Sequence, residues 1–204
     1  MKLLLLKSFQ IAVVAAAAIA GTVRASVEIG QPAPDFTLKD INGQTRHLSD
    51  FKGKTVVLEW VNPECPIVQK HYHSQNMQKL QKSATGDGVV WLSINSGHPG
   101  AQGDFDAAKA SGWLKEQGAS PTAYFRDQDG KVGRLYSAKT TPHLFVITAE
   151  GTLVYEGAID SIRSADQADI PKATNYVAAA LSAVKAGQPV STATSQPYGC
   201  AVKY

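Results

Sequence analysis

Cysteine is scarce in this sequence. The chain has 204 residues but only two cysteines, Cys65 and Cys200. Small disulfide-stapled proteins use several bridges, so two cysteines exclude that class and are the right number for one redox pair. Because 44% of the residues are hydrophobic and 18% are charged, the composition is instead that of one globular domain with its own core.

Clusters of like charge and internal repeats are also missing. The formal net charge of +3 is spread along the chain, so we expect no nucleic-acid partner. His71 and His73 stand two apart on a predicted helix and point to different faces, which argues against a shared metal ion. We therefore expect no metal and no cofactor. No stretch after residue 25 is long and apolar enough to span a membrane.

Residues 1–25 have the pattern of a secretory signal peptide. Two lysines flank an apolar start, residues 11–19 are small and apolar, and Val23 and Ala25 occupy the small-residue positions of a cleavage site. We predict cleavage after Ala25 and a periplasmic or secreted protein without membrane contact afterwards; an uncleaved anchor helix is the alternative. An oxidising compartment would make a disulfide between the two cysteines chemically reasonable.

Residues 54–68 carry the most informative pattern. The almost continuous apolar run at residues 56–61 is typical of a strand buried on both faces. An Asn-Pro pair ends this run, and Pro66 suits the first position of a helix. Cys65 is therefore predicted at a helix N-cap, where unpaired N–H groups and the helix dipole stabilise a thiolate. The alternative is a small buried hydrophobic residue.

Predicted strands and helices alternate along the rest of the chain. After short strands ending at Leu38 and at 44–48, we expect strands at 55–61, 89–94, 123–125, 143–148 and 153–158, and helices at 66–83, 105–117 (capped by Asp104), 132–137 and 175–185. Such alternation predicts an α/β fold with a parallel core sheet, to which the last two strands add an antiparallel hairpin. We expect one domain over 26–187 and a C-terminal tail over 188–204.

Four segments, in this order, resemble the thioredoxin-fold redoxins, which include the AhpC/TSA peroxiredoxin group and the TlpA/ResA-like thiol oxidoreductases. They are GQPAPDFTL near the predicted mature start, LSDFKGKTVVLEW before the thiol, Cys65-Pro66 at the helix start, and TTPHLFVIT with DSIR downstream. The resemblance covers about residues 29–181. It implies a thioredoxin-like fold, with a central mixed sheet flanked by helices, and thiol chemistry at Cys65.

The sequence departs from both thiol motifs of this group. If Cys65 is aligned with the first cysteine of Cys-x-x-Cys, Val68 stands where the second belongs. A gapped alignment puts Cys65 at the second position, with Asn62 in place of the first. The peroxiredoxin signature Pro-x-x-x-Thr-x-x-Cys also lacks its threonine, because position 62 is Asn. A dithiol within one helical turn is therefore excluded.

Cys200 is the only other thiol in the chain, and a reacting Cys65 must be restored by a second thiol. It follows a glycine in a tail that we expect to be flexible. Peroxiredoxins use a distal resolving cysteine, so the resemblance implies a Cys65–Cys200 cycle. The alternatives are a permanent structural disulfide, worth about 4–5 kcal/mol in the chain-entropy model, and two unpaired cysteines.

The resemblance also implies a substrate-docking segment. Thr141 and Pro142 stand where thioredoxin-like proteins carry a cis-proline that faces the reactive cysteine and presents backbone to a substrate. We therefore predict a cis bond between them. His143 follows and is a candidate auxiliary residue; the alternative is a surface or strand-edge histidine.

Three further polar residues are candidate auxiliaries. Glu59 lies within the apolar strand and resembles the buried acid that accepts a proton in some thioredoxin-like proteins; the alternative is a residue at the sheet edge or paired with a lysine. Glu64, next to Cys65, is expected to disfavour the thiolate modestly and to affect substrate choice. Asn62 could donate a hydrogen bond to the sulfur.

These observations predict an exported thiol-dependent oxidoreductase. Cys65 would attack a peroxide O–O bond or a protein disulfide, Cys200 would resolve the product, and electrons would come from a thiol electron-donor protein. The alternative is a redox-inert thioredoxin-like binding module with a structural Cys65–Cys200 disulfide. The missing second active-site cysteine favours that alternative, and the helix-start position of Cys65 opposes it.

Overall fold

A five-stranded mixed sheet forms the centre of the protein. The computed structural model describes residues 27–204, so the predicted signal peptide lies outside the described residues. The strand order is β5-β4-β3-β7-β8. The strands are β3 (Val56–Trp60), β4 (Val90–Asn95), β5 (Ala123–Arg126), β7 (His143–Ile147) and β8 (Leu153–Gly157). β3 pairs in parallel with β4, and β4 with β5, whereas β7 and β8 are antiparallel. The predicted α/β fold with a terminal hairpin is confirmed.

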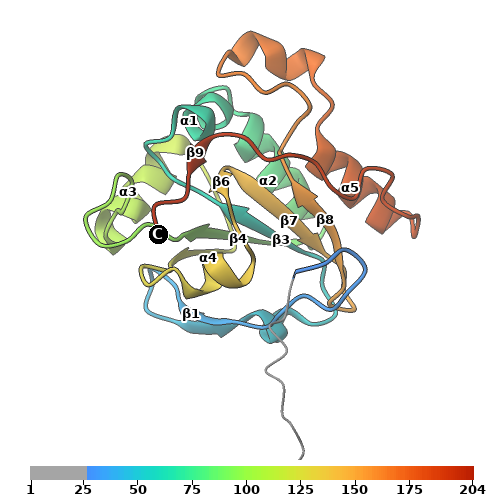
Figure 1. Cartoon of the computed structure of the whole chain (residues 1–204), viewed down its shortest axis with the longest axis horizontal. Coiled ribbons are helices and arrows are strands. Elements are labelled where there is room, and N and C mark those ends of the chain that lie inside the picture. The colour runs from blue at the N-terminus through green and yellow to red at the C-terminus, as the bar shows by residue number, and fades with distance from the viewer. Residues whose placement is uncertain (1–26) are drawn as a thin grey trace, which may run out of the picture.

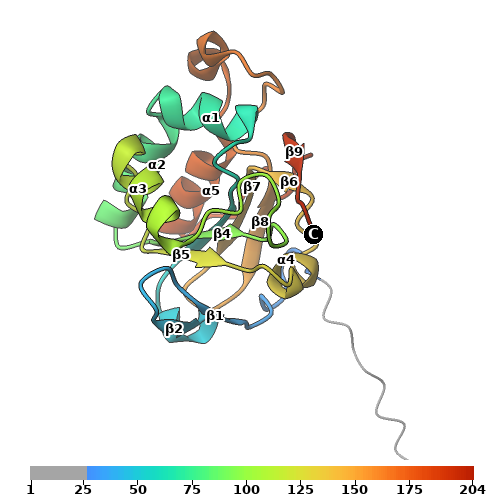
Figure 2. The ribbon, with the colours of Figure 1, turned by 90° about the vertical axis from the view of Figure 1, so that its left-hand side faces the viewer.

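Helices cover both faces of this sheet (Figures 1 and 2). One face carries the longer helices, and the other carries α4, η1 and a small β1–β2 hairpin. The bounds are α1 (Pro66–His73), α2 (Asn76–Gly86), α3 (Ala107–Gln117), α4 (Lys131–Leu135), α5 (Tyr176–Lys185), η1 (Leu48–Phe51), η2 (Gln167–Lys172), β1 (Thr37–Lys39) and β2 (Thr45–His47).

The central strand β3 separates two hydrophobic cores. All five of its residues are buried, as the apolar run predicts. Val57 packs on the side of α1, α2 and α5, whereas Leu58 and Trp60 pack on the side of α4. Because side chains alternate along a strand, Glu59 and the residue Val61 after β3 share the α1 face with Val57. The same face holds Cys65.

Two predicted helices begin or end differently in the structure. The single helix expected at 66–83 is divided into α1 and α2 at Gln75, whose backbone is left-handed with φ 63°. α3 begins after Asp106, whose side chain accepts from the Lys109 amide, and not after Asp104. Asp104 instead binds Arg126 and Gln128.

The C-terminal tail is packed along the protein, contrary to the flexible tail that we expected. It runs from the end of α5 past α1 and ends beside α4 (Figure 1). Its strand β9 (Cys200–Ala201) pairs antiparallel with β6 (Thr140–Thr141). The sequence pattern predicted neither of these short strands. Upstream, the Ser195 amide donates to the Glu156 carbonyl of β8, and the Glu156 amide donates to the Ala193 carbonyl. Within residues 27–204, no helix has the length and apolarity needed to cross a membrane.

Candidate functional site

Cys65 lies at the turn between the central strand and α1. It is the N-cap residue of α1 with an extended backbone, and Pro66 occupies the first helical position, as predicted. Its amide donates to the Asn62 carbonyl at 3.0 Å and closes the turn. The first-turn amide of Val68 points at the sulfur and favours its anionic form. The side chain is fully buried.

Cys200 is brought onto this sulfur by the pairing of β9 with β6. Thr141 is the direct partner of Cys200 across the two strands. The Cys200 amide donates to Cys65 Sγ at 3.3 Å, and the Cys200 thiol is close enough to interact with the same sulfur. When Cys65 carries its proton, Sγ donates to the Thr141 carbonyl at 3.1 Å. The structure thus places together two thiols that are 135 positions apart in sequence.

The segment opposite Cys65 has the predicted backbone form. The Thr141–Pro142 peptide bond is cis. Thr141 presents its carbonyl oxygen to the sulfur, and the edge of this segment is occupied by the chain's own β9. The predicted docking residues therefore face Cys65, and the position predicted for a substrate backbone is taken by Cys200 and Ala201.

The two thiols are electrostatically unequal. Burial raises the pKa of Cys65, but hydrogen bonds from the Cys200 thiol and from the Val68 and Cys200 amides more than offset it, so the net pKa is lowered. Burial and the neighbouring Cys65 raise the pKa of Cys200 to about 11. One negative charge shared by the pair would therefore reside on Cys65, which makes it the better nucleophile at neutral pH.

Asn62 and Glu64 both bind the loop before α3. The Asn62 side chain donates to the Gln102 carbonyl and accepts from the Glu64 amide, so the predicted hydrogen bond to Cys65 is wrong. The Glu64 carboxylate accepts from the Gly103 amide at 2.8 Å, and Lys109 lies 4.0 Å away. Both residues fasten the loop before α3 to the turn that carries Cys65.

Glu59 is buried on the Cys65 face of the sheet. Four groups donate to its carboxylate: the Tyr72 hydroxyl, the Gln81 amide, the Trp91 indole and the Ser93 hydroxyl. Burial raises the pKa of Glu59, although these hydrogen bonds oppose the rise. The interpretation as a sheet-edge or lysine-paired residue is therefore wrong.

The hydrogen-bond partners of Glu59 do not include Cys65, so no direct contact supports the predicted proton-accepting role. The carboxylate bonds to Tyr72, which lies seven residues beyond Cys65 and thus roughly 10 Å farther along α1 at about 1.5 Å per residue. The contact between Glu59 and the helix that Cys65 caps is the hydrogen bond from Tyr72.

His143 is buried on the face of the sheet opposite to Cys65. It stands two positions before Phe145 on β7, so the two side chains lie on the same face of the sheet. Their rings pack together with 4.4 Å between centroids. Its Nδ1 accepts from the Lys139 amide. Burial lowers the pKa of His143 to about 3. The auxiliary role is not supported, and the surface or edge alternative is wrong as well, because β7 is an interior strand.

Buried histidines predict acid sensitivity. Burial lowers the pKa of His71 to about 4 and that of His143 to about 3. A histidine in the unfolded chain has a pKa near 6.5. The unfolded chain therefore binds protons first as the pH falls, so the free energy of unfolding should decrease from about pH 6.5 to pH 4. Urea unfolding measures the free energy of unfolding at each pH. In His143→Phe, the slope of this free energy against pH should correspond to about one proton fewer taken up on unfolding than in the wild type. In His73→Gln, an exposed control, the slope should match the wild type.

A buried polar cluster beside the tail was missed by sequence reasoning. The Tyr198 hydroxyl donates to Asp160 Oδ1 at 2.5 Å. Lys70 Nζ and His71 Nε2 each lie 3.8 Å from Asp160 Oδ2, and all four side chains are buried. Lys70 also lies over the Tyr198 ring at 5.8 Å. The one signal in the sequence was Tyr198, an aromatic residue two positions before Cys200. Its partner Asp160 lies 38 positions away, so neighbouring residues could not identify it.

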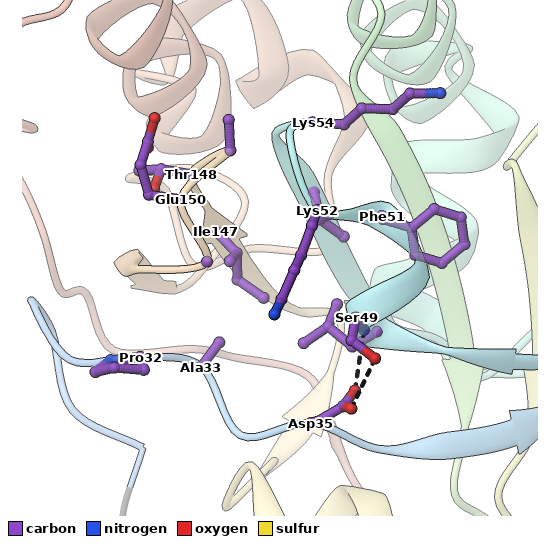
Figure 3. A pocket seen from close by; sticks show the side chains of 14 residues that line it. Pro32, Ala33, Asp35, Ser49, Phe51, Lys52, Lys54, Ile147, Thr148 and Glu150 are labelled. Atoms are coloured by element: carbon purple, nitrogen blue, oxygen red, sulfur yellow. Dashed lines mark hydrogen bonds between the residues drawn. The ribbon is translucent and has the colours of Figure 1, made fainter.

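A cavity of about 330 Å³ lies at the other end of the sheet (Figure 3). Val56 at the start of β3 and Ile147 at the end of β7 line it, with Lys52 and Lys54 among the surrounding side chains. Neither cysteine lines it, because Cys65 follows the opposite end of β3. Beside Thr141 and Ala201, a hollow of about 10 Å³ has room for roughly one water molecule, and neither cysteine lines it.

Comparisons with known proteins agree with this geometry. Residues 29–156 match the AhpC/TSA family. The chain belongs to the AhpC/TSA family. The thiol-disulfide oxidoreductase ResA of Bacillus subtilis is 30% identical over 130 residues, which are 63% of this chain and 66% of that protein. The putative peroxiredoxin bcp of Coxiella burnetii is 28% identical over 121 residues, 59% of this chain and 73% of that protein.

Solved structures show the thioredoxin-like fold of this AhpC/TSA member. A putative thiol:disulfide interchange protein DsbE from Chlorobium tepidum matches with a TM-score of 0.56 and 25% identity, over 76% of this chain and 99% of that one. An uncharacterized conserved protein from Geobacillus kaustophilus matches with 0.75 and 26% identity, over 88% and 94%. This chain aligns with 44–66% of the length of three ResA proteins, those of Bacillus subtilis, Geobacillus kaustophilus and Geobacillus thermodenitrificans. The general class is thus thiol-based redox proteins.

Among residues 27–204, no three histidine, cysteine, aspartate or glutamate side chains are grouped as ligands for a metal ion.

Proposed function

We propose that this AhpC/TSA protein is an exported thiol-disulfide oxidoreductase in which Cys65 is the nucleophile and Cys200 the resolving cysteine. The observation that supports it is the contact between the two thiols, with the pKa lowered at Cys65 and raised at Cys200. Export rests on the leader-like residues 1–25. The donor would be a thiol protein.

The reaction balances as two thiol exchanges. The Cys65 thiolate attacks one sulfur of a substrate disulfide, the S–S bond breaks, and the departing thiolate takes a proton. The Cys200 thiol loses its proton and attacks Cys65 Sγ, which releases the second substrate thiol and leaves a Cys65–Cys200 disulfide. Two thiols of the donor protein then reduce that disulfide, so each cycle moves two electrons from donor to substrate.

A peroxide is the second candidate substrate. The relatives named as peroxiredoxins and the water-sized hollow beside Thr141 and Ala201 favour it. Reduced protein should be offered an insulin-type disulfide and hydrogen peroxide separately. Disulfide reduction without peroxide loss supports the first candidate, the reverse result supports the second, and neither activity would contradict both.

The thiolate of Cys65 provides a further test. Because the net effect of its surroundings lowers its pKa, thiolate absorbance should develop below the ordinary value of ~8.5, and that of Cys200 well above it. Subtracting the titration of a Cys65→Ser, Cys200→Ser double variant from that of the wild type isolates the absorbance of the two thiolates. A Cys65 pKa at or above ~8.5 would remove the main electrostatic argument for catalysis.

A further inference from the structure

Strand β9 covers the sulfur on which the proposed function depends. Cys65 has 0% exposed surface, and the Cys200 amide and thiol lie against it. A substrate sulfur must reach Cys65 directly for exchange to occur, and the hollow beside Thr141 and Ala201, of about 10 Å³, holds no more than roughly a water molecule. An external disulfide can therefore meet Cys65 only after β9 has moved.

The cover is held by few contacts of its own. β9 pairs with β6 over two residues, and Cys200 is half-buried while Ala201 is exposed. Downstream, the Val202 amide donates to the Lys139 carbonyl, the His98 amide donates to the Lys203 carbonyl, and Tyr204 bonds to the Ala138 carbonyl and stacks under Arg134. Such a short edge pairing can open locally without unfolding the central sheet.

Tyr198 is the upstream anchor of the cover. It is buried, and its hydroxyl donates to Asp160 Oδ1 at 2.5 Å. Asp160 follows β8, so this bond ties the tail to the body of the domain two residues before Cys200. The second carboxylate oxygen, Oδ2, has no hydrogen-bond partner, because Lys70 and His71 remain 3.8 Å away. The Tyr198 bond is thus the direct link between this cluster and the tail.

Gly199 allows the close approach between β9 and β6. Its φ is +138°, a conformation that residues with a side chain rarely adopt. A Cβ atom built on Gly199 would lie 2.0 Å from the Thr141 carbonyl oxygen, the atom that also contacts Cys65 Sγ. Any larger residue would push β9 away from the site.

We propose that Tyr198, acting through Asp160, and Gly199 are the positioning residues of a displaceable strand. Closed, the strand shields Cys65 and holds Cys200 ready to resolve it; open, it exposes Cys65 and frees the β6 edge for the substrate. The inference rests on the proposed function, since an inert module has no need to open. It assigns to residues 198–201 control over both substrate entry and the second exchange step.

Alkylation of Cys65 measures the opening. In a Cys200→Ser background of the full chain, Tyr198→Phe should raise the rate of iodoacetamide labelling of Cys65 by about tenfold or more, the cost expected for one buried hydrogen bond to a carboxyl group. A bulky maleimide should show the same factor, since both reagents need the open strand. Tyr136→Phe is the matched control, because it loses a phenol hydrogen bond to the Pro34 carbonyl away from β9.

Gly199→Ala should open the strand further than Tyr198→Phe. Its control is Gly112→Ala, where an added Cβ meets nothing within 4 Å. With Cys200 retained, oxidation by glutathione disulfide gives a second readout. The first exchange at Cys65 should be faster, but return of Cys200 should be slower, so the Cys65–glutathione mixed disulfide should accumulate in the variant and not in the wild type.

Three outcomes would overturn the inference. The first is wild-type Cys65 that labels as fast as a free thiol, and the second is Tyr198→Phe and Gly199→Ala that label no faster than their controls. Unfolding curves of all variants are needed, because faster labelling with an equal loss of global stability would also contradict a local strand movement. None of these outcomes depends on substrate turnover, so a failed insulin assay would be recognised separately as failure of the proposed function.

Discussion

Cys65→Ser is expected to lose disulfide reductase activity by at least about a thousandfold, because the hydroxyl that replaces the thiol is not an effective nucleophile at neutral pH. Cys200→Ser is expected to fail at a different step. It retains Cys65 and completes the first exchange, but it lacks the thiol that releases the substrate. One equivalent of substrate should therefore remain attached to Cys65 as a mixed disulfide.

Intact mass spectrometry and turnover assays distinguish these results. With an excess of disulfide peptide, Cys200→Ser should gain the mass of one substrate thiol per chain, whereas Cys65→Ser should gain none under the same brief exposure. Serine at position 200 leaves the backbone pairing of β9 with Thr141 available, so the comparison isolates the thiol. Full turnover by Cys200→Ser would show that another thiol resolves Cys65 and would contradict the assigned pair.

The inert alternative predicts a different pattern for the same pair. A structural Cys65–Cys200 bond would resist mild reductant until the protein unfolds, and both single variants would lose stability to a similar extent. Backbone pairing of β9 and the Tyr198 anchor hold the two cysteines in place, and neither contact involves an S–S bond. The arrangement of the tail therefore persists without the covalent bond, which favours a reversible pair.

Local patterns were sufficient to predict the position of Cys65. The apolar run, the Asn-Pro break and Pro66 act within a few residues, so strand, turn and helix start could be derived from neighbours in sequence. The cis bond at Pro142 and the AhpC/TSA family followed from the resemblance. What the pattern missed was the pairing of Cys200 with Thr141, because a two-residue strand carries no periodic signal and its partner is 59 positions away.

Polar residues in the core show the same limit. Glu59 could be recognised as unusual within an apolar strand, but its four donors come from α1, α2 and β4. A hydrogen bond from Asn62 to the sulfur was predicted because the two residues are close in sequence. In the structure the Asn62 side chain instead donates to the Gln102 carbonyl in the loop before α3. Side-chain direction at a turn depends on tertiary partners, which neighbouring residues in the sequence do not specify.

Glu59→Ala is expected to be the most destabilising single substitution in this core. It would leave four buried donors facing Glu59 without their acceptor, and breaking a buried charged or hydrogen-bonded group of this kind costs about 3–5 kcal/mol. Because Tyr72 would lose its partner, α1 should loosen, and the labelling of Cys65 at its N-cap should rise as well. Urea unfolding measures the first effect and alkylation the second.

Glu59→Gln separates charge from shape in the same network. The amide keeps the volume but turns an NH₂ group toward donors, so we expect a loss of about 1–3 kcal/mol. Since burial raises the pKa of Glu59 above the unfolded value, the folded wild type holds its proton to higher pH and loses stability as the pH rises above about 4.5. Glutamine lacks this term, so its deficit should be largest below about pH 4.5 and smaller at neutral pH. A deficit that does not change with pH would show that Glu59 is ionised with an ordinary pKa, and that its four hydrogen bonds fully replace the water lost on burial.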